Sequence, residues 1–304
     1  MSERTPQSLF VSGASGLIGR SLLQRLEEQE GPPLVCLSRN LGAAPQRRAR
    51  FVQGDLLEPG GWRSALKRCS GVVHLAALTG KASAEQYARV NVEGTRRLLE
   101  ECAQAGVRRF VHVSTIAVRY PDLSRYPYAR SKLEAEALVR SSGLEWAIVR
   151  PTIVLGRRAP AWRSLAQLAK LPLAPLFGGG RARVQPILAA DVAAALADLL
   201  AQERLQGEEC DLGGPEVLTV EDLLQRIRRA LGRGKLRAVR LPAGAPIALL
   251  AALEKPLLGL LPVTAGQLHA LVYDGVAEPN PLLERQLPRM RPLDEALAEL
   301  ARAR

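Results

Sequence analysis

The sequence of 304 residues predicts a doubly wound α/β fold, a parallel sheet covered by helices, with a smaller C-terminal lobe. Three observations support this expectation. Short, nearly continuous apolar runs recur along the first half of the chain, as is typical of strands buried on both faces. Longer amphipathic segments separate several of these runs, which indicates β-α-β alternation. A glycine-rich turn directly follows the first apolar run.

The apolar runs after the first βα unit have the length of strands in a parallel sheet. They are residues 34–37, 51–53, 71–75, 109–113 and 146–149. The segment from Ala84 to Ala105 instead repeats its apolar residues at helical spacing, and Gly106 is a typical C-terminal stop. A long helix is therefore expected between the fourth and fifth strands.

The glycine-rich turn has the spacing Gly13-x-x-Gly16-x-x-Gly19 and leads into a helix expected from Leu17. Each glycine has its own physical reason: a tight turn, close approach of the backbone to a pyrophosphate, and close packing of helix on strand. The free N–H groups at the start of that helix suit phosphates. A merely structural turn is the alternative, because such a turn alone is weak evidence. The turn favours a dinucleotide-binding fold of the Rossmann type.

The pattern changes after Arg150-Pro151, where prolines and the run Gly178-Gly179-Gly180 interrupt the alternation. We predict a dinucleotide-binding domain over residues 1–156 and a substrate lobe over residues 157–304. The two are expected to interleave, with about 184–230 returning to the edge of the Rossmann sheet. This return includes a strand at 209–213 and a helix that Thr219 caps and that runs to Arg229.

Composition argues against several classes of function. The formal net charge is +12, but the basic residues are spread along the chain and aromatic residues make up 4%, so no nucleic-acid partner is expected. The four cysteines lack metal-ligand spacing and are interpreted as buried apolar residues. His74 and His112 lie within apolar strand patterns, so no metal site is expected. The polar N-terminus contains no signal peptide, and we expect a cytoplasmic protein.

The segment 246–261 is apolar enough to form a surface or lid helix that contacts a membrane surface or a hydrophobic substrate. A helix packed on the second lobe is the simpler interpretation, because Glu254, Lys255 and Pro256 interrupt the apolar run. Membrane-surface contact through 246–261 stays open on this pattern, and a homo-oligomer is also compatible with the sequence.

Tyr128 and Lys132 form a second motif that points to function. They are four residues apart, and residues with this spacing on a helix project from one face. A nearby ammonium group favours the phenolate, so the pKa of Tyr128 is expected to be lowered. Upstream, Ser114 and Thr115 end an apolar strand with two hydroxyls. One of them can polarise a carbonyl oxygen while Tyr128 exchanges the proton. The tyrosine and lysine spacing is common by chance, but its place after a hydroxyl-tipped strand makes it specific.

Together these motifs resemble the extended branch of the short-chain dehydrogenase/reductase superfamily, the NAD-dependent epimerase/dehydratase family, over residues 8–230. The resemblance implies a catalytic set of Thr115, Tyr128 and Lys132, supported by Asn91 through a helix kink or a bound water. Cofactor binding is implied for Gly13, Ser15, Gly16, Leu17, Ile18, Gly19, Ser38, Arg39, Asp55, Leu56, Leu75, Ala76, Ala77, Ser114, Tyr128, Lys132, Pro151, Thr152 and Ile153.

Two departures narrow what the resemblance implies. Nucleotide-sugar enzymes of this branch hold substrate phosphate with an arginine at the position of Val184, which argues against such a substrate. The connection from Thr115 to Tyr128 is also short for the extended branch.

The stretch 178–187, with Asp191-Val192 after it, is similar to atypical members related to the NADPH-binding accessory subunit of respiratory complex I. Some of those members lack the tyrosine and lysine, and this chain keeps both.

The end of the second predicted strand indicates the cofactor. An acidic residue there would accept from the ribose 2′-hydroxyl and repel a 2′-phosphate, but this chain has Ser38-Arg39. A guanidinium favours a phosphate, so NADP is expected in preference to NAD, with a solvated loop arginine as the alternative. We therefore expect an oxidoreductase or epimerase/dehydratase that transfers hydride at the carbonyl or alcohol carbon of a small or lipophilic substrate, with Tyr128 as acid/base. The alternative is a non-catalytic NADP-binding subunit or sensor.

Overall fold

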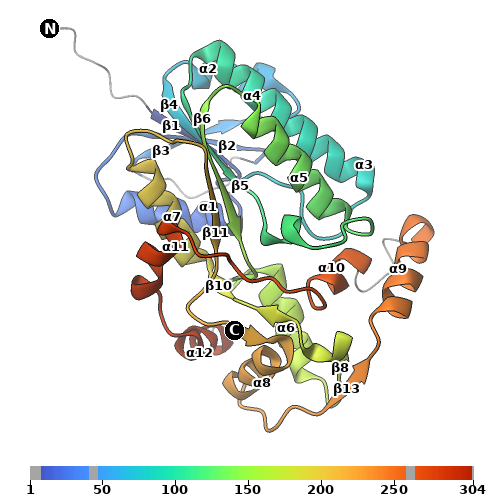
Figure 1. The fold of residues 1–304 in the computed structure, drawn as a ribbon. Helices are drawn as coiled ribbons and strands as arrows, with labels where there is room; N and C mark the ends of the chain where they lie inside the picture. The colour runs from blue at the N-terminus through green and yellow to red at the C-terminus, as the bar shows by residue number, and fades with distance from the viewer. Residues whose placement is uncertain (1–7, 41–46, 258–263, 303–304) are drawn as a thin grey trace, which may run out of the picture.

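A seven-stranded parallel sheet forms the centre of the computed structural model, which describes residues 8–40, 47–257 and 264–302 (Figure 1). The strand order is β11-β6-β5-β4-β1-β2-β3. The strands are β1 (Ser8–Ser12), β2 (Leu34–Ser38), β3 (Ala49–Gln53), β4 (Cys69–His74), β5 (Arg109–Val113), β6 (Glu145–Pro151) and β11 (Glu208–Leu212). Every apolar run predicted to be a strand is a strand of this sheet, and the predicted fold class is confirmed.

The order of the strands reverses beside β1, because the chain first moves outward through β2 and β3 and then returns to form β4 on the other side. In open parallel sheets, ligands bind outside the carboxyl ends of the strands at such a reversal. The glycine turn follows β1 and residues 75–77 follow β4, so both lie at this point.

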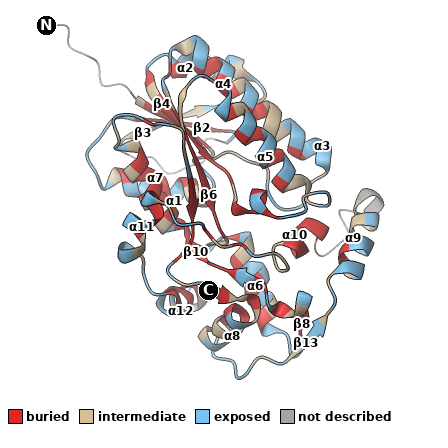
Figure 2. Ribbon diagram, in the orientation of Figure 1, coloured by how far each residue is buried: buried red, intermediate tan, exposed pale blue. Residues whose placement is uncertain are grey.

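Helices cover both faces of the sheet, and successive side chains of β1 pack against the helices on opposite faces. Leu9 and Val11 pack in the core beneath α1 (Leu17–Glu27), α7 (Ala189–Leu200) and α11 (Pro281–Gln286). Phe10 packs in the opposite core with α2 (Arg63–Leu66), α4 (Gly94–Ala105) and α5 (Pro127–Arg140). The central strands are buried along most of their length (Figure 2). Burial on both faces explains why the sequence shows continuous apolar runs there.

The helix expected from Ala84 to Ala105 forms as one helical run of three parts. It consists of α3 (Ala84–Tyr87), a π-helical segment (Ala88–Glu93) and α4. Gly106 ends it with a φ of 74°, in the left-handed region, as the pattern predicts. The widened π-helical turn contains Asn91, one of the predicted site residues, and such turns are frequent at functional sites.

The second half of the chain forms a smaller core between helices. Its helices α6 (Pro160–Lys170), α8 (Val220–Ala230) and α12 (Leu293–Arg302) pack on one another. Three strand pairs accompany them: β7 (Val154–Leu155) with β10 (Ile187–Leu188), β9 (Arg183–Val184) with β12 (Leu218–Thr219), and β8 (Ala174–Phe177) with β13 (Ala238–Leu241). The helix expected after Thr219 is α8, and the Thr219 side chain accepts from the Asp222 N–H as its cap.

The chain returns to the large sheet between these smaller elements. Strand β11 pairs in parallel with β6 at the sheet edge, and α7 packs against α1. The strand predicted at 209–213 is therefore β11. The division of the chain into a cofactor domain and a substrate lobe at residue 156 stays a prediction.

The apolar segment at 246–261 begins within α9 (Gly244–Leu257), and its residues 258–261 lie outside the described residues. On α9, Ile247 is buried, whereas 62% of Leu249 is exposed. The short helix α10 (Ala265–His269) lies against α9. No helix in the described ranges is both long and apolar enough to cross a membrane. Contact of this segment with a membrane surface stays a prediction.

Short 3-10 turns complete the described chain: Pro59–Gly61, Ile116–Arg119, Gly178–Gly180 and Leu287–Arg289. All four cysteines are buried and none forms a disulfide, which confirms their interpretation as small core residues.

Candidate active site

The glycine turn between β1 and α1 forms a cradle that side chains would fill. Gly13 has a φ of 74°, and a Cβ atom on it would lie 2.5 Å from the Ala76 nitrogen. A Cβ atom on Gly19 would lie 2.3 Å from the Gly13 carbonyl oxygen. Both positions therefore require glycine, because the backbone approaches itself too closely for any side chain.

The start of α1 faces this cradle without a side-chain cap. Gly16 is the N-cap residue, and no side chain accepts from the first N–H groups of the helix. Unpaired N–H groups at a helix N-terminus bind phosphate well. The cradle and the uncapped helix together fit the pyrophosphate of a dinucleotide, which Gly13, Ser15, Gly16, Leu17, Ile18 and Gly19 would hold.

The remaining cofactor candidates lie along the same edge of the sheet. Each group follows the carboxyl end of one parallel strand. The groups are Ser38 and Arg39 at β2, Asp55 and Leu56 after β3, Leu75, Ala76 and Ala77 after β4, Ser114 after β5, and Pro151, Thr152 and Ile153 at the end of β6. The fold thus gathers residues that are far apart in the sequence along one sheet edge.

The two turns nearest the expected adenosine position differ in exposure. Ser38 is buried and its hydroxyl donates to the Asn40 carbonyl oxygen at 2.7 Å, whereas Arg39 is exposed. Asp55 accepts from the Leu57 N–H at 2.9 Å, which fixes the turn after β3. Leu56 is buried. Arg39 is thus accessible to a ligand, and residues 38–40 contain no carboxylate.

Thr115 and Tyr128 meet at the carboxyl end of β5. Tyr128 lies in the first turn of α5, and the Thr115 side chain makes a polar contact with its phenol. The backbone of Ser114 donates to the Val149 carbonyl oxygen at 2.7 Å, which ties the end of β5 to β6. The structure therefore brings together two of the three residues predicted to be catalytic.

The expected lowering of the Tyr128 pKa is wrong for the protein without a cofactor. Burial of the phenol, with Tyr87 beside it, raises its pKa to about 12, and the contact from Thr115 lowers it only in part. The ring centroids of Tyr87 and Tyr126 both lie 5.8 Å from that of Tyr128. The cost of placing a charge among these rings outweighs any attraction from Lys132.

Lys132 is almost fully buried, with 2% of its surface exposed. Its Nζ donates to the Val113 carbonyl oxygen at 2.8 Å and lies 3.1 Å from His112 Nε2. Burial lowers the pKa of Lys132 to about 7, while the carboxylate of Glu136, one helical turn further, raises it. The end of β5 thus holds the ammonium group of Lys132. Along α5, Lys132 lies one helical turn after Tyr128.

Glu136 is itself the centre of a buried ion pair. Its carboxylate accepts from Arg150 Nε at 2.9 Å and from an Arg150 terminal nitrogen at 2.7 Å. The guanidinium of Arg150 holds the pKa of this carboxyl below its usual range against the opposing effect of burial. The paired contact joins α5 to β6 one helical turn beyond Lys132.

Asn91 contacts α5 directly through a side chain. Its amide donates to Ser131 Oγ at 3.0 Å, and Ser131 Oγ in turn donates to the Tyr128 carbonyl oxygen at 2.7 Å. Asn91 also accepts from the Leu78 N–H at 2.7 Å. The structure thus connects the π-helical segment to the backbone of Tyr128, and a role of Asn91 through a helix kink or a water stays a prediction.

His112 and the rings around Tyr128 are site residues that the sequence reasoning missed. His112 lies two residues after Phe110, on the face of β5 that meets the α5 core, and a polar residue on that apolar face is a readable signal. Tyr87 lies in α3, whereas Tyr126 is the N-cap residue of α5 and Tyr128 lies in its first turn, so the tertiary structure brings the Tyr87 ring to the other two.

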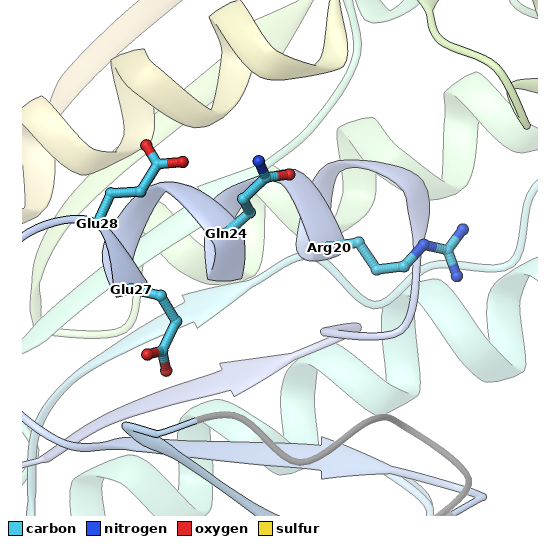
Figure 3. Close-up of a pocket in the computed structure, with 4 residues that line it drawn as sticks. All are labelled: Arg20, Gln24, Glu27 and Glu28. Carbon is cyan, nitrogen blue, oxygen red and sulfur yellow. The ribbon is translucent and has the colours of Figure 1, made fainter. Parts of the chain in front are cut away.

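A shallow hollow along the outside of α1 is lined by Arg20, Gln24, Glu27 and Glu28 (Figure 3). Arg20 is the residue of this row nearest the start of the helix, and its guanidinium donates to the Ser15 carbonyl oxygen at 2.6 Å. The hollow mixes both charges and contains none of the predicted catalytic residues. Arg20 supports the turn that forms the cradle, and the hollow is not the active site.

Residues 9–213 match the NAD dependent epimerase/dehydratase family, and the chain belongs to this family. Ceramide reductase of Caulobacter vibrioides is 33% identical over 189 residues, which cover 61% of this chain and 58% of that protein. The mitochondrial NADH dehydrogenase [ubiquinone] 1 alpha subcomplex subunit 9 of Arabidopsis thaliana is 27% identical over 247 residues, covering 76% of this chain and 60% of that protein. The chain thus spans less than two thirds of the length of either relative.

A similar solved structure is that of a dTDP-glucose 4,6-dehydratase from Streptomyces venezuelae, determined with NAD and TYD bound. Its TM-score is 0.72 at 25% identity, with 97% of this chain and 96% of that chain covered. The predicted resemblance to the extended branch, including relatives of the complex I subunit, is confirmed at the level of the family.

Proposed function

We propose that this protein is an NADP-dependent reductase acting on the carbonyl group of a small or lipophilic compound, or on the corresponding alcohol in reverse. The observation that carries the proposal is the meeting of Thr115 and Tyr128 at the end of β5, at the sheet edge that also holds the glycine cradle. The cofactor, when bound, supplies or accepts the hydride.

Each of the three polar side chains has a separate task in this proposal. The Thr115 hydroxyl polarises the substrate carbonyl oxygen and holds it beside the phenol. Tyr128 donates a proton to that oxygen as the carbon is reduced, and its raised pKa of about 12 keeps it protonated and ready to donate. The ammonium of Lys132 stabilises the phenolate that remains.

The preference for NADP rests on the turn after β2. Arg39 is exposed there, and residues 38–40 offer no carboxylate to a ribose 2′-hydroxyl. A guanidinium forms charge-assisted bonds with a 2′-phosphate, which NAD lacks.

The substrate class rests on two features of the site. The buried Val184 provides no cation at the position where nucleotide-sugar enzymes hold phosphate, which disfavours a nucleotide sugar. The phenol of Tyr128 contacts the rings of Tyr87 and Tyr126, which favours an uncharged, lipophilic group beside the reacting carbon. Ceramide reductase, among the relatives, is named for the reduction of a lipid.

Turnover tests the proposal against a non-catalytic NADP-binding role. The purified protein is mixed with NADPH and a panel of aldehydes and ketones of increasing chain length, and the loss of NADPH absorbance is followed. The Tyr128→Phe variant, prepared in parallel, detects contaminating reductases. Turnover by the wild type alone supports the proposal. Tight NADPH binding with no turnover across the panel contradicts it and favours a cofactor-holding subunit.

A further inference from the structure

The contact between Lys132 and His112 is buried completely and joins α5 to β5. Lys132 Nζ lies 3.1 Å from His112 Nε2, and His112 has no exposed surface. The same Nζ donates to the Val113 carbonyl oxygen at 2.8 Å. An ammonium group has three N–H donors, so these two partners use two of them and one remains.

This contact determines where His112 carries its proton. A charged ammonium can only donate, so His112 Nε2 must accept with its lone pair, and the single ring proton must be on Nδ1. Burial, Lys132 and His74 together hold the pKa of His112 well below its usual range, so the ring is neutral. The charged or titratable groups facing the pair are His74 from β4 and Glu136 from α5.

His74 provides a contrast, because its own contacts require the opposite tautomer. The ring centroids of His74 and His112 lie 5.2 Å apart. The Thr95 hydroxyl donates its only proton to the Asn91 carbonyl oxygen at 2.6 Å, so it must accept from His74 Nε2, which lies 2.9 Å away. His74 Nδ1 then accepts from the Ser12 hydroxyl at 2.6 Å. The proton of His74 is therefore on Nε2.

His112 Nδ1 has no hydrogen-bond partner among the described residues, although it is buried. A buried polar atom without a partner lowers the stability of the fold. An apolar ring of similar size would fill the position without that loss. What a histidine adds at position 112 is its acceptor toward Lys132.

We propose that His112 is a positioning residue for Lys132. Its Nε2 and the Val113 carbonyl oxygen hold the ammonium at the end of β5 by two of its donors. The third N–H is left over for the phenolate of Tyr128 or for a hydroxyl of a dinucleotide when one is bound. The inference rests on the proposed function for its catalytic consequence, but the hydrogen-bond arrangement itself is testable in the protein without substrate.

The tautomer is measured by nitrogen-15 NMR of protein labelled only at histidine. The chain has three histidines, so the ring correlations are few. At about pH 6, below the Lys132 pKa of about 7, His112 is expected to show the Nδ1–H pattern and His74 the Nε2–H pattern. Replacing Lys132→Met should remove the preference of His112 and leave His74 unchanged. An Nε2–H or doubly protonated His112 in the wild type would overturn the proposal.

The consequence for the site is measured with a matched pair of variants. His112→Gln keeps an acceptor oxygen near the Nε2 position, whereas His112→Phe keeps the ring and removes the acceptor. We expect His112→Phe to weaken NADPH binding about tenfold, measured by NADPH fluorescence, and His112→Gln to restore most of it. With a carbonyl that the protein reduces, kcat should fall more in His112→Phe than in His112→Gln, while KM changes little in both.

These readouts separate the two proposals. If no carbonyl is reduced but His112 has the Nδ1–H pattern and His112→Phe weakens NADPH binding, the reductase function fails and the positioning role holds. Equal NADPH affinity in the wild type, His112→Gln and His112→Phe overturns the positioning role. Equal losses in both variants, with unchanged melting temperatures, also overturn it, because an acceptor at this position would then have no effect.

Discussion

A Cβ atom on Gly19 would lie 2.3 Å from the carbonyl oxygen of Gly13. The first turn of α1 therefore packs directly on the backbone of the preceding turn, and this contact shapes the cradle at the helix N-terminus. At Gly16 the nearest atom to such a Cβ would be the same oxygen at 3.1 Å, a much smaller overlap. The three glycines thus tolerate a methyl group to different degrees.

We predict that Gly19→Ala lowers the free energy of unfolding by about 1–3 kcal/mol, because the added methyl forces α1 away from the turn. NADPH affinity should fall with it. Gly60→Ala is the control, since a Cβ there meets nothing within 4 Å. Urea unfolding and calorimetric titration measure the two effects. A Gly19→Ala protein as stable as Gly60→Ala would contradict the close packing.

Tyr128→Phe should lower turnover by about 10² to 10⁴-fold, because the phenol is the proposed proton donor. Cofactor affinity should change little, since the ring and its contacts remain. Tyr273→Phe is a matched control: its ring packs against Tyr120 and His269 in the same aromatic group. Steady-state rates with a carbonyl that the wild type reduces measure the difference. Equal rates in the two variants would rule out the proposed role of Tyr128.

The strands and the cradle could be predicted from the sequence because local patterns determine them. Leu9, Phe10 and Val11 form a continuous apolar run since alternate residues enter two different cores. The glycines of the cradle are three positions apart, so the contact between Gly19 and the Gly13 carbonyl oxygen is also local. Periodicity and turn chemistry are sufficient where the contacting residues are close along the chain.

The inner structure of the site could not be predicted in this way. The bond from Asn91 to Ser131 joins residues forty positions apart, and the bond from His112 to Lys132 joins twenty. The first bond depends on how α5 packs on the π-helical segment and the second on how α5 packs on β5, and no local pattern specifies either. The predicted direction of the Tyr128 pKa shift was wrong for the same reason. The spacing to Lys132 suggested a lowered pKa, but burial of the phenol, with Tyr87 from a separate helix beside it, raises the pKa.

Cofactor choice is testable at the turn after β2. We predict that calorimetric titration of the wild type gives tighter binding of NADP than of NAD by about tenfold or more, since a hydrogen bond to a charged group contributes about 1.5–3 kcal/mol. The double variant Ser38→Asp/Arg39→Asn adds a carboxylate and removes the exposed guanidinium, so its preference should move toward NAD. If the wild type binds both cofactors equally, or the double variant keeps the preference for NADP, Arg39 does not determine the choice between NADP and NAD.

A fragment of residues 1–156 should aggregate or unfold. It lacks β11, which pairs with β6, and α7, which packs against α1. The fragment would therefore expose a strand edge and the apolar surface beneath α7. Size-exclusion chromatography and thermal unfolding against the full chain measure this. A soluble fragment with a cooperative transition would show that the first 156 residues form an independent domain.

Lys132→Met should stabilise the fold at low pH although it removes a catalytic group. Burial lowers the Lys132 pKa from 10.5 to about 7, so the folded state disfavours the ammonium. Between these two values the unfolded chain binds more protons than the folded one, so this group makes stability rise with pH there. Its cost is complete below about pH 7 and disappears above about pH 10.5.

The melting temperature of Lys132→Met should therefore exceed that of the wild type most at about pH 6, and the gap should shrink as the pH approaches about 10. Lys67→Met is the control, because Lys67 is exposed and the same change there should have a small effect at every pH. Thermal unfolding of the three proteins across this range measures the gap. If Lys132→Met is less stable than the wild type by the same amount at all pH values, the bonds of Lys132 to Val113 and His112 outweigh the cost of its burial.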